Sequence, residues 1–403
     1  MSPRPAHAPN FITLLLIAAV STLTLNSFVP LLPDIADDLG TSYAVASLSI
    51  GLYLGLTAIV QLVGGPLSDY LGRRPVLLTA LGLFSVASLG CVLSAGITMF
   101  LGFRMLQAVI VSAFVIVLAI VRDTHAERNT AKLIGYLSMA MAVSPMIGPA
   151  IGGAVGAAFG WRSIFAAYFA LGVALLALCW RGVRETNHSR EATIAAQFAE
   201  YPKLLNSPRF WGYAMCMAFS TGAFYAFVAG APLIAGRLFE LKAETLGIGL
   251  GTITAGFFFG NLIATRLADR IDLTATMIAG RLIACAGPLA GIGLEAFGAL
   301  NATAFFGAAV LVGFGNGLTM PGANAGAISV LPALVGSAAG LSGAMIVGGG
   351  AIVTTLTGTL MSYAGSAVPL LAIMFAASFA SLLAVLFVHR VEPARPTEPR
   401  RSS

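Results

Sequence analysis

Long apolar runs separated by short polar breaks make up most of the chain. An α-helix needs about 20 apolar residues to cross the hydrocarbon core of a bilayer. Runs of this length predict twelve membrane helices, at residues 11–32, 43–65, 75–95, 98–121, 133–157, 163–181, 210–235, 245–265, 274–297, 303–328, 336–360 and 366–388. The runs are continuous and lack the alternating pattern of a membrane strand. The pattern therefore predicts an all-α membrane protein.

The twelve runs fall into two groups of six. The longest hydrophilic stretch, residues 181–209, lies between the sixth and seventh runs, and the segment at 67–69 is echoed at 267–269. Parallel six-helix repeats place a substrate site near the membrane midplane, between the two halves. We expect two pseudo-symmetric six-helix bundles, at residues 1–181 and 210–390. A cytoplasmic linker at 182–209 joins them, and a cytoplasmic tail follows at 391–403.

The composition agrees with a membrane protein and excludes several other classes. Hydrophobic residues make up 58% of the chain and charged residues 9%, and the mean hydropathy is +0.91. A soluble domain is about one-quarter charged, and a disordered chain has fewer apolar residues and more charge. The sequence thus excludes an ordinary soluble enzyme and a disordered chain, and the lipid bilayer is an expected partner.

The basic residues predict how the helices are oriented. The chain has 22 Lys and Arg residues and a formal net charge of +6. If both termini are cytoplasmic, 17 of the basic residues lie in cytoplasmic segments, 3 lie in outer loops, and 2, Arg104 and Arg281, lie within apolar runs. This asymmetry follows the positive-inside rule. We interpret the positive charge as a mark of the cytoplasmic face rather than as a nucleic-acid-binding surface.

Few residues are suited to catalysis, metal binding or ATP use. The cysteines all lie inside apolar runs, at spacings that suggest neither a metal site nor a disulfide framework: Cys91, Cys179, Cys216 and Cys285. The histidines lie in loops or near the ends of runs, and the sequence has no phosphate-binding G-x-x-x-x-G-K-[ST] loop. We therefore expect no enzymatic activity, no metal and no cofactor, and a non-transporting receptor has little support.

The most distinctive motif is the turn GPLSDYLGRRP at residues 65–75, between the second and third runs. Glycines suit a tight turn between two helices, and the acid and paired arginines can form a charge cluster that closes the inner face. A plain basic turn is the alternative. The motif resembles the signature loop of the major facilitator superfamily, usually written G-x-L-a-D-x-x-G-R-R. The resemblance implies the fold of that superfamily and a gate motif made of Gly65, Asp69, Gly72, Arg73 and Arg74.

Further segments narrow the resemblance to the Bcr/CflA-type drug:proton antiporters. Residues 30–36, 103–108 and 119–123 resemble patterns of that group. Residues 144–153 resemble its antiporter motif, G-P-x-x-G-G, through Pro145, Gly148, Pro149, Gly152 and Gly153. The resemblance implies an exporter in the bacterial inner membrane, with Asp123 as a partner of the gate arginines.

Small residues in the segment 144–153 recur four apart on one helix face, which permits close approach of a second helix. Generic packing explains the spacing equally well. The resemblance implies that the partner is the glycine-rich helix at 336–360, and that their close packing supports switching between inward-open and outward-open states.

Two arginines lie within apolar runs, and the sequence suggests different roles for them. A charge inside a membrane costs several kcal/mol unless it is paired or hydrated, so Arg104 is a functional candidate, with snorkelling to the interface as its alternative. Gln107 lies one turn further along the same face. The resemblance implies that Arg104 is a cavity arginine involved in proton coupling. Arg281 lies within two turns of the cytoplasmic side, and we expect its side chain to snorkel to that interface.

The chain departs from the antiporters at one position in its first helix. Relatives usually carry a membrane-embedded acid four residues before the first proline of P-x-L-P, and here that residue is Asn26. Asp34 lies eight residues later, roughly 12 Å along a helix. It is the best candidate proton carrier, and its alternative role is solvation of the helix end beside Asp37 and Asp38.

Polar and aromatic residues within the runs are candidates for the lining of a substrate cavity. They are Asn26, Tyr53, Arg104, Gln107 and Tyr225. Unsatisfied polar groups in lipid are costly, so each must find a partner or line a hydrated path. Interhelical hydrogen bonding, or packing in the case of Tyr225, is the alternative.

Two functional hypotheses follow. The first is a monomeric secondary transporter that exports small amphipathic, drug-like compounds by alternating access, driven by inward flow of protons. The second keeps the same fold without proton coupling. It rests on Asn26 and Arg104, which leave the cavity without a counter-charge for cations, so that neutral or anionic solutes would move by facilitated diffusion or exchange.

Overall fold

The computed structural model describes residues 10–124, 127–187, 201–267, 270–330, 335–361 and 365–391. Over these residues the chain is helical, and twelve spans are long and apolar enough to cross a membrane. The twelve predicted membrane helices are therefore confirmed. Residues 268 and 269, which carry most of the second copy of the short repeat, lie outside the described residues.

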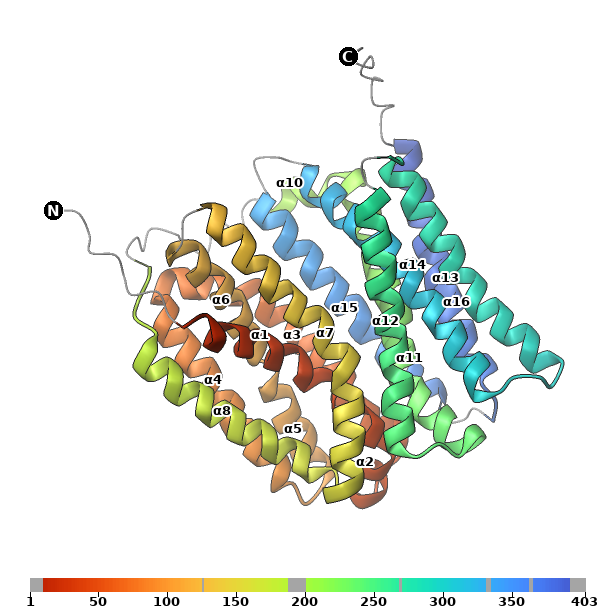
Figure 1. The fold of residues 1–403 in the computed structure, drawn as a ribbon, viewed down its shortest axis with the longest axis horizontal. Coiled ribbons are helices and arrows are strands. Elements are labelled where there is room, and N and C mark those ends of the chain that lie inside the picture. Colours follow the sequence, from red (N-terminus) through yellow and green to blue (C-terminus); the bar gives the residue numbers. More distant parts are fainter. Residues whose placement is uncertain are drawn as a thin grey trace, which may run out of the picture.

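The first six spans form the N-terminal half of the molecule (Figure 1). Their elements are α1 (Phe11–Asn26), the short 3₁₀ helix η1 (Val29–Leu31), α2 (Leu32–Asp38), α3 (Tyr43–Leu71), α4 (Arg73–Val92), α5 (Ile97–Gln107), α6 (Ile110–Thr124), α7 (Glu127–Phe159) and α8 (Arg162–Gly182). The first span combines α1, η1 and α2, and the fourth combines α5 and α6.

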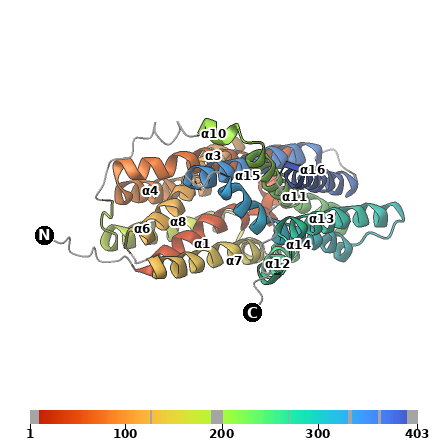
Figure 2. The same ribbon diagram turned by 90° about the horizontal axis from the view of Figure 1, so that it is seen from above.

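The other six spans form the C-terminal half. A short helix, α10 (Tyr201–Leu205), precedes it, and its membrane helices are α11 (Pro208–Phe239), α12 (Ala243–Leu267), α13 (Leu273–Ala296), α14 (Ala302–Ser329), α15 (Val335–Met361) and α16 (Val368–Val391). Figure 2 shows the two halves side by side when the molecule is viewed from above. The structure is thus the predicted pair of six-helix bundles.

The molecule has two different ends. We call the end that carries α10, Arg73 and Arg390 the basic end, and the opposite end, which carries α2, the distal end. At the distal end the halves are tied together, since the Tyr43 hydroxyl donates a hydrogen bond of 2.5 Å to the Ala229 carbonyl oxygen. Figure 1 shows α7 and α12 close together near the distal end and separating toward the basic end. The structure is therefore closed on the distal side.

Large apolar side chains cover the outside of the bundle. Ile59, Phe259, Leu282 and Ile352 are all more than half exposed. Burying apolar surface is worth roughly 25 cal/mol per Å², so a surface of this kind is costly in water and suits contact with lipid. The residues that a soluble protein would bury thus face the bilayer, and the interior is left to close helix packing.

Contacts between the halves pair α7 with α12 and α3 with α15. A Cβ on Gly247 or Gly251 of α12 would overlap backbone carbonyl oxygens of α7, and a Cβ on Gly358 of α15 would overlap the Ser47 hydroxyl of α3. The prediction that the helix at 144–153 packs against the helix at 336–360 is therefore wrong. Each of these glycine-bearing helices meets a different helix of the opposite half, because the two bundles are related by pseudo-symmetry.

Two spans are broken in the middle, and both breaks lie in the N-terminal half. The first span is interrupted after Asn26, where Pro30 and Pro33 lack the amide donor of a regular helix. The fourth is interrupted after Gln107, at an Ala-Val pair that contains no proline or glycine. Each break leaves the last carbonyl groups of a helix inside the membrane region. A helix C-terminus carries a partial negative charge of about one half.

Candidate functional site

Arg104 lies at the centre of the N-terminal half with none of its surface exposed. It occupies the last turn of α5, and three aromatic rings surround its guanidinium. The guanidinium carbon lies 4.2 Å from the ring centroid of Phe28, 4.6 Å from that of Tyr53 and 5.8 Å from that of Phe165. The negative faces of such rings attract a cation, most strongly where water is excluded.

The hydrogen bonds of Arg104 leave part of its guanidinium unpartnered. Its Nη1 donates to Gln107 Oε1 at 2.6 Å and to the Thr24 carbonyl oxygen at 3.4 Å. Gln107 in turn donates from Nε2 to Ser88 Oγ at 2.8 Å. The Nε and Nη2 atoms of Arg104 have no hydrogen-bond partner among the described residues, and no ion pair there includes Arg104.

The break in the first span explains how this charge is held without an acid. Arg104 lies in the last turn of α5, and it donates to a carbonyl in the last turn of α1. The C-terminus of α1, at the break of the first span, therefore directs partial negative charge at this guanidinium. Broken membrane helices bind cations in the same way at the centre of many transporters.

Arg281 provides the corresponding charge in the C-terminal half, and the expectation that it snorkels is wrong. Its side chain is fully buried. Its Nε donates to Thr319 Oγ1 at 2.8 Å, its Nη1 to Ser220 Oγ at 2.7 Å, and its Nη2 to Asn316 Oδ1 at 2.8 Å. Because α11 and α14 supply a neutral acceptor for every nitrogen, the side chain gains nothing by extending to the interface.

Asn26 faces the boundary between the halves. Its Nδ2 donates to the Thr22 carbonyl oxygen at 3.0 Å, and 5% of its surface is exposed. It lines a small pocket of about 10 Å³, with room for about one water molecule, whose walls come from both halves: Val29, Pro145, Pro149, Phe224, Val228, Leu250 and Thr254. Arg104 does not line this pocket. The sequence grouped Asn26 and Arg104 in one cavity, and the structure places them on different sides of the first span.

The two candidate tyrosines come from opposite halves. Tyr53 in α3 is 1% exposed, and its hydroxyl has no hydrogen-bond partner among the described residues. Tyr225 in α11 is half-buried and packs so closely on α15 that a Cβ on Gly350 would lie 2.6 Å from its ring. Tyr53 thus belongs to the surroundings of Arg104, and Tyr225 to the contact of α11 with α15.

Asp34 lies away from these buried groups. It is exposed in the first turn of α2, near the distal end. Its neighbour Asp38 forms an ion pair with Arg162 at 2.5 Å and accepts a hydrogen bond of 3.1 Å from Trp161 Nε1. A proton on Asp34 is therefore accessible from the distal side in this conformation.

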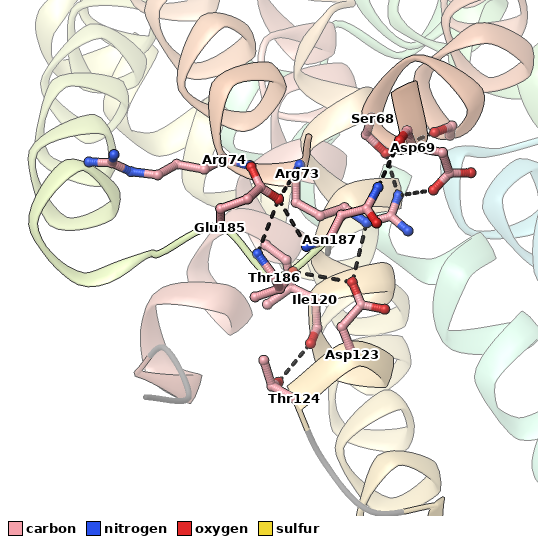
Figure 3. Close-up of polar contacts among 11 residues, drawn as sticks. Ser68, Asp69, Arg73, Arg74, Ile120, Asp123, Thr124, Glu185, Thr186 and Asn187 are labelled. Atoms are coloured by element: carbon pink, nitrogen blue, oxygen red, sulfur yellow. Dashed lines mark hydrogen bonds and ion pairs between the residues drawn. The ribbon is translucent and has the colours of Figure 1, made fainter. Parts of the chain in front are cut away.

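The gate motif forms a polar cluster at the basic end (Figure 3). Arg73 pairs through Nη1 with Asp69 at 2.5 Å and through Nε with Asp123 at 3.3 Å, and its Nη1 also donates to Ser68 Oγ at 2.6 Å. Arg74 points away from this group and donates to the Trp180 carbonyl oxygen at 3.0 Å. The structure thus brings Asp69, Arg73 and Asp123 together. Gly65 lies beside the neighbouring helix α6, where a Cβ would make only ordinary contact.

Glu185, just after α8, is a member of this cluster that the sequence did not suggest. Its carboxylate accepts four backbone N–H groups, those of Arg73, Arg74, Thr186 and Asn187, at 2.8 to 3.2 Å. Burial opposes its charge, but the four donors outweigh burial and lower the pKa of the Glu185 carboxyl. Glu185 is one of three acids in a basic linker, with Glu191 and Glu200, and such acids are usually solvated, so no signal in the sequence singles it out.

The antiporter-motif residues contact both halves of the molecule. A Cβ on Gly152 would overlap the Ser27 carbonyl oxygen in the first span, and a Cβ on Gly148 would lie 3.1 Å from the Ser27 hydroxyl. A Cβ on Gly153 would overlap the Ala243 carbonyl oxygen of α12, across the boundary. Pro145 and Pro149 line the pocket at Asn26. This helix face therefore joins the broken first span to the opposite half.

The fold and site define a class of protein. Twelve membrane-spanning helices in two bundles, and a buried charge beside a broken helix, are the features of a secondary transporter. The sequence model of the Major Facilitator Superfamily matches residues 14–259. The chain belongs to this superfamily, and it is a multi-pass membrane transporter rather than an enzyme.

Several known proteins are similar to this chain. An uncharacterised MFS-type transporter of Bacillus subtilis is 30% identical over 300 residues, which cover 70% of this chain and 75% of the relative. A chloramphenicol resistance protein of Pseudomonas aeruginosa is 34% identical over 255 residues, 60% of this chain and 59% of that protein. Multidrug resistance protein D of Escherichia coli is 26% identical over 351 residues, 86% of this chain and 88% of that protein.

Solved structures support the fold. A bacterial homologue of the human lysosomal transporter Spinster, in an inward-facing and unoccupied conformation, superimposes with a TM-score of 0.72 at 16% identity, over 97% of this chain and 96% of that chain. The same homologue in an inward-facing and occupied conformation gives a TM-score of 0.71. At this identity the likeness concerns the fold alone.

Proposed function

We propose that the protein exports small amphipathic, drug-like compounds across the bacterial inner membrane by alternating access. The observation that carries the proposal is the arrangement of the two six-helix halves, which are tied together at the distal end and separate toward the basic end, as one state of an alternating-access cycle requires. Relatives named as multidrug and chloramphenicol resistance proteins support a drug-like substrate. The proposed transporter works as a monomer, since each chain contributes both halves of the pocket.

The proposed orientation places the basic end in the cytoplasm. Arginines concentrate at this end, as the positive-inside rule requires of a cytoplasmic face. With this orientation the distal closure through Tyr43 makes the structure inward-facing. Export then requires that the contacts of α7 with α12 open at the distal end while the basic end closes.

The proposed driving force is inward flow of protons. Asp34 supports it, because an exposed carboxylate in a broken helix can exchange protons with the distal side and lies within the same span as Asn26. The resemblance to drug:proton antiporters also assigns Arg104, a fully buried charge, to proton coupling. In this scheme Asp34 binds a proton from outside, and the switch of conformation delivers it inward.

A second candidate function is transport of neutral or anionic solutes without proton coupling. One observation favours it: among the described residues no carboxylate pairs with Arg104, whose Nε and Nη2 are unpartnered. A cavity near an uncompensated cation repels cationic drugs and tolerates neutral or anionic ones. Asn26 cannot supply the missing negative charge at any pH.

Transport in proteoliposomes separates the two candidates. We would measure uptake of chloramphenicol as a neutral probe, with tetraphenylphosphonium and tetraphenylborate as probes of similar shape and opposite charge. Proton antiport predicts that chloramphenicol uptake stops when an imposed pH gradient is collapsed. The uncoupled candidate predicts uptake that is independent of the gradient and that favours tetraphenylborate over tetraphenylphosphonium.

Two variants refine this experiment. Asp34→Asn should abolish the gradient dependence, while Asp37→Asn, the same chemical change at an exposed neighbour on the same helix, should preserve it. Asn26→Asp should add uptake of tetraphenylphosphonium, because it places a carboxylate in the pocket between the halves. If gradient-driven uptake is unchanged in Asp34→Asn, the assignment of Asp34 is wrong.

A further inference from the structure

We infer that residues 185–187 form a clamp that fixes the gate motif, with Glu185 as its positioning residue. We use "the clamp" for Glu185, Thr186 and Asn187. The inference rests on the proposed alternating-access function only where it predicts an effect of the clamp on transport. Its structural basis is a set of hydrogen bonds at the basic end that the resemblance to known transporters did not include (Figure 3).

The first part of the clamp caps a membrane helix. The amides in the first turn of a helix have no partner within the helix, and α4 begins after Gly72, which has no side chain to serve as a cap. Glu185 Oε1 accepts the Arg73 amide at 2.8 Å, and Oε2 accepts the Arg74 amide at 3.2 Å. A carboxylate at a helix N-terminus also interacts favourably with the helix dipole. Glu185 therefore replaces the missing cap from 112 residues away.

The contact explains the glycine of the gate motif. Gly72 has a φ of +105°, a conformation that other residues rarely adopt. A Cβ at this position would lie 2.5 Å from Glu185 Oε2 and 3.0 Å from its carboxyl carbon. A side chain on residue 72 would therefore strain the backbone and also displace the carboxylate.

The other two residues of the clamp extend it to two more helices. Thr186 Oγ1 donates to Asp123 Oδ2 at 3.1 Å, at the end of α6. Asn187 Nδ2 donates to the Asp69 carbonyl oxygen at 2.7 Å, at the end of α3. Both acids that pair with Arg73 are thus held by the clamp. Thr186 binds the side chain of Asp123, and Asn187 binds the backbone of Asp69.

The clamp fixes the relative positions of α3, α4 and α6 at the basic end. Three consecutive residues bind the end of one helix, the beginning of the next and the end of a third. The part of the chain that moves with the N-terminal half therefore extends to Asn187. The sequence had suggested a boundary at residue 181. During a rocking motion the Arg73 ion pairs stay assembled and present one rigid surface to the opposite half.

Hydrogen–deuterium exchange of the purified full-length protein tests the clamp without a transport assay. Fragmentation that resolves the Arg73 and Arg74 amides should show both protected in the wild type, although helix-start amides normally exchange freely. In Glu185→Ala both should exchange at least tenfold faster. In Glu185→Gln the amide oxygen can keep the contacts of Oε1, so Arg73 should remain protected and Arg74 should not.

Arg184→Gln is the matched control, because it removes the charge of the exposed neighbouring residue. Its exchange pattern should equal that of the wild type. If the wild type shows no protection at Arg73, or if Glu185→Ala keeps it, the clamp does not exist in solution. Neither result depends on whether the protein transports drugs.

Transport kinetics test the consequence of the clamp. Glu185→Ala should lower the maximal rate roughly fivefold, the effect of about one hydrogen bond, and leave KM within about twofold of the wild type. The maximal rate of Glu185→Gln should fall between that of the wild type and that of Glu185→Ala. A change in KM alone, or unchanged kinetics together with lost amide protection, would show that the clamp does not position the gate.

Discussion

Among the described residues two arginines are fully buried, one in each half, and their surroundings differ. Arg281 donates a hydrogen bond from each of its three nitrogens to neutral side chains. Arg104 donates from one nitrogen only, lies among aromatic rings, and has two unpartnered nitrogens among the described residues. Neither forms an ion pair in the described part of the chain.

We propose that the difference separates a structural charge, Arg281, from a functional one, Arg104. A fully hydrogen-bonded guanidinium fixes the helices that supply its acceptors, and a new ligand has nothing to add. An incompletely bonded guanidinium costs folding energy, and it retains donors that a substrate or a change of conformation can use. The N-terminal half, with its two broken spans, is therefore the half in which we place the coupling of charge to movement.

The largest expected effect is on stability, from loss of Arg281. Arg281→Met leaves Asn316 Oδ1 without its donor and opens space between α11, α13 and α14, so it should cost roughly 2–4 kcal/mol of unfolding free energy. Arg104→Met should cost less than half as much, because it also removes unpartnered donors. Thermal unfolding in detergent measures both, and equal losses would contradict the comparison.

The next effect is on transport, from a conservative change at Arg104. Arg104→Lys keeps the charge but loses the planar group that lies over Phe28 and Tyr53, so chloramphenicol uptake should fall about tenfold. Arg281→Lys should retain most of its uptake per folded molecule. If the two variants lose uptake equally, then Arg281 also takes part in transport.

A matched pair of hydroxyl deletions gives a smaller effect. Thr319→Val removes the acceptor of Arg281 Nε and should cost about 1.5–3 kcal/mol, since a charged donor loses its partner. Tyr53→Phe removes a buried hydroxyl that has no partner among the described residues, and should leave the unfolding midpoint unchanged or raise it. A large loss of stability in Tyr53→Phe would show that its hydroxyl is bonded in solution.

The smallest expected effect is that of pH on Glu185, a fully bonded charge like Arg281. Because the folded-state pKa of the Glu185 carboxyl is lowered, its contribution to stability is fully present above the ordinary pKa of 4.5. That contribution is lost only as the pH falls through the lower folded-state pKa. Protection of the Arg73 amide, corrected for intrinsic exchange, should therefore be the same at pH 6 and pH 8. Protection that falls between these values would place the pKa near neutrality.

The sequence predicted the main features of the fold because the bilayer imposes simple rules on length and polarity. Continuous apolar runs predicted all twelve spans. The motif at 65–75 placed Asp69 and Arg73 in one cluster with Asp123, and their side chains do meet. These features depend on short-range patterns, which a single chain displays directly.

The sequence failed where the outcome depended on which helices pack together. It paired the helix at 144–153 with the helix at 336–360, whereas α7 packs against α12. It expected Arg281 to snorkel, because the acceptors at Ser220 and Asn316 lie on helices far away in the chain. It omitted Glu185, because two of the four amides that it accepts, those of Arg73 and Arg74, lie more than 100 residues earlier in the chain.

By itself, the sequence determined that this chain is a twelve-helix membrane protein with an asymmetric distribution of basic residues and a distinctive charged turn between its second and third spans. Hydrophobic length and charge are properties of segments, and each segment meets the same lipid. Only the tertiary structure decided which buried charge is satisfied, which glycines permit contact between the halves, and which linker residues fix the gate. Those outcomes depend on distances of 3 to 4 Å between helices that lie far apart in the chain, and such distances exist only once all twelve helices are packed.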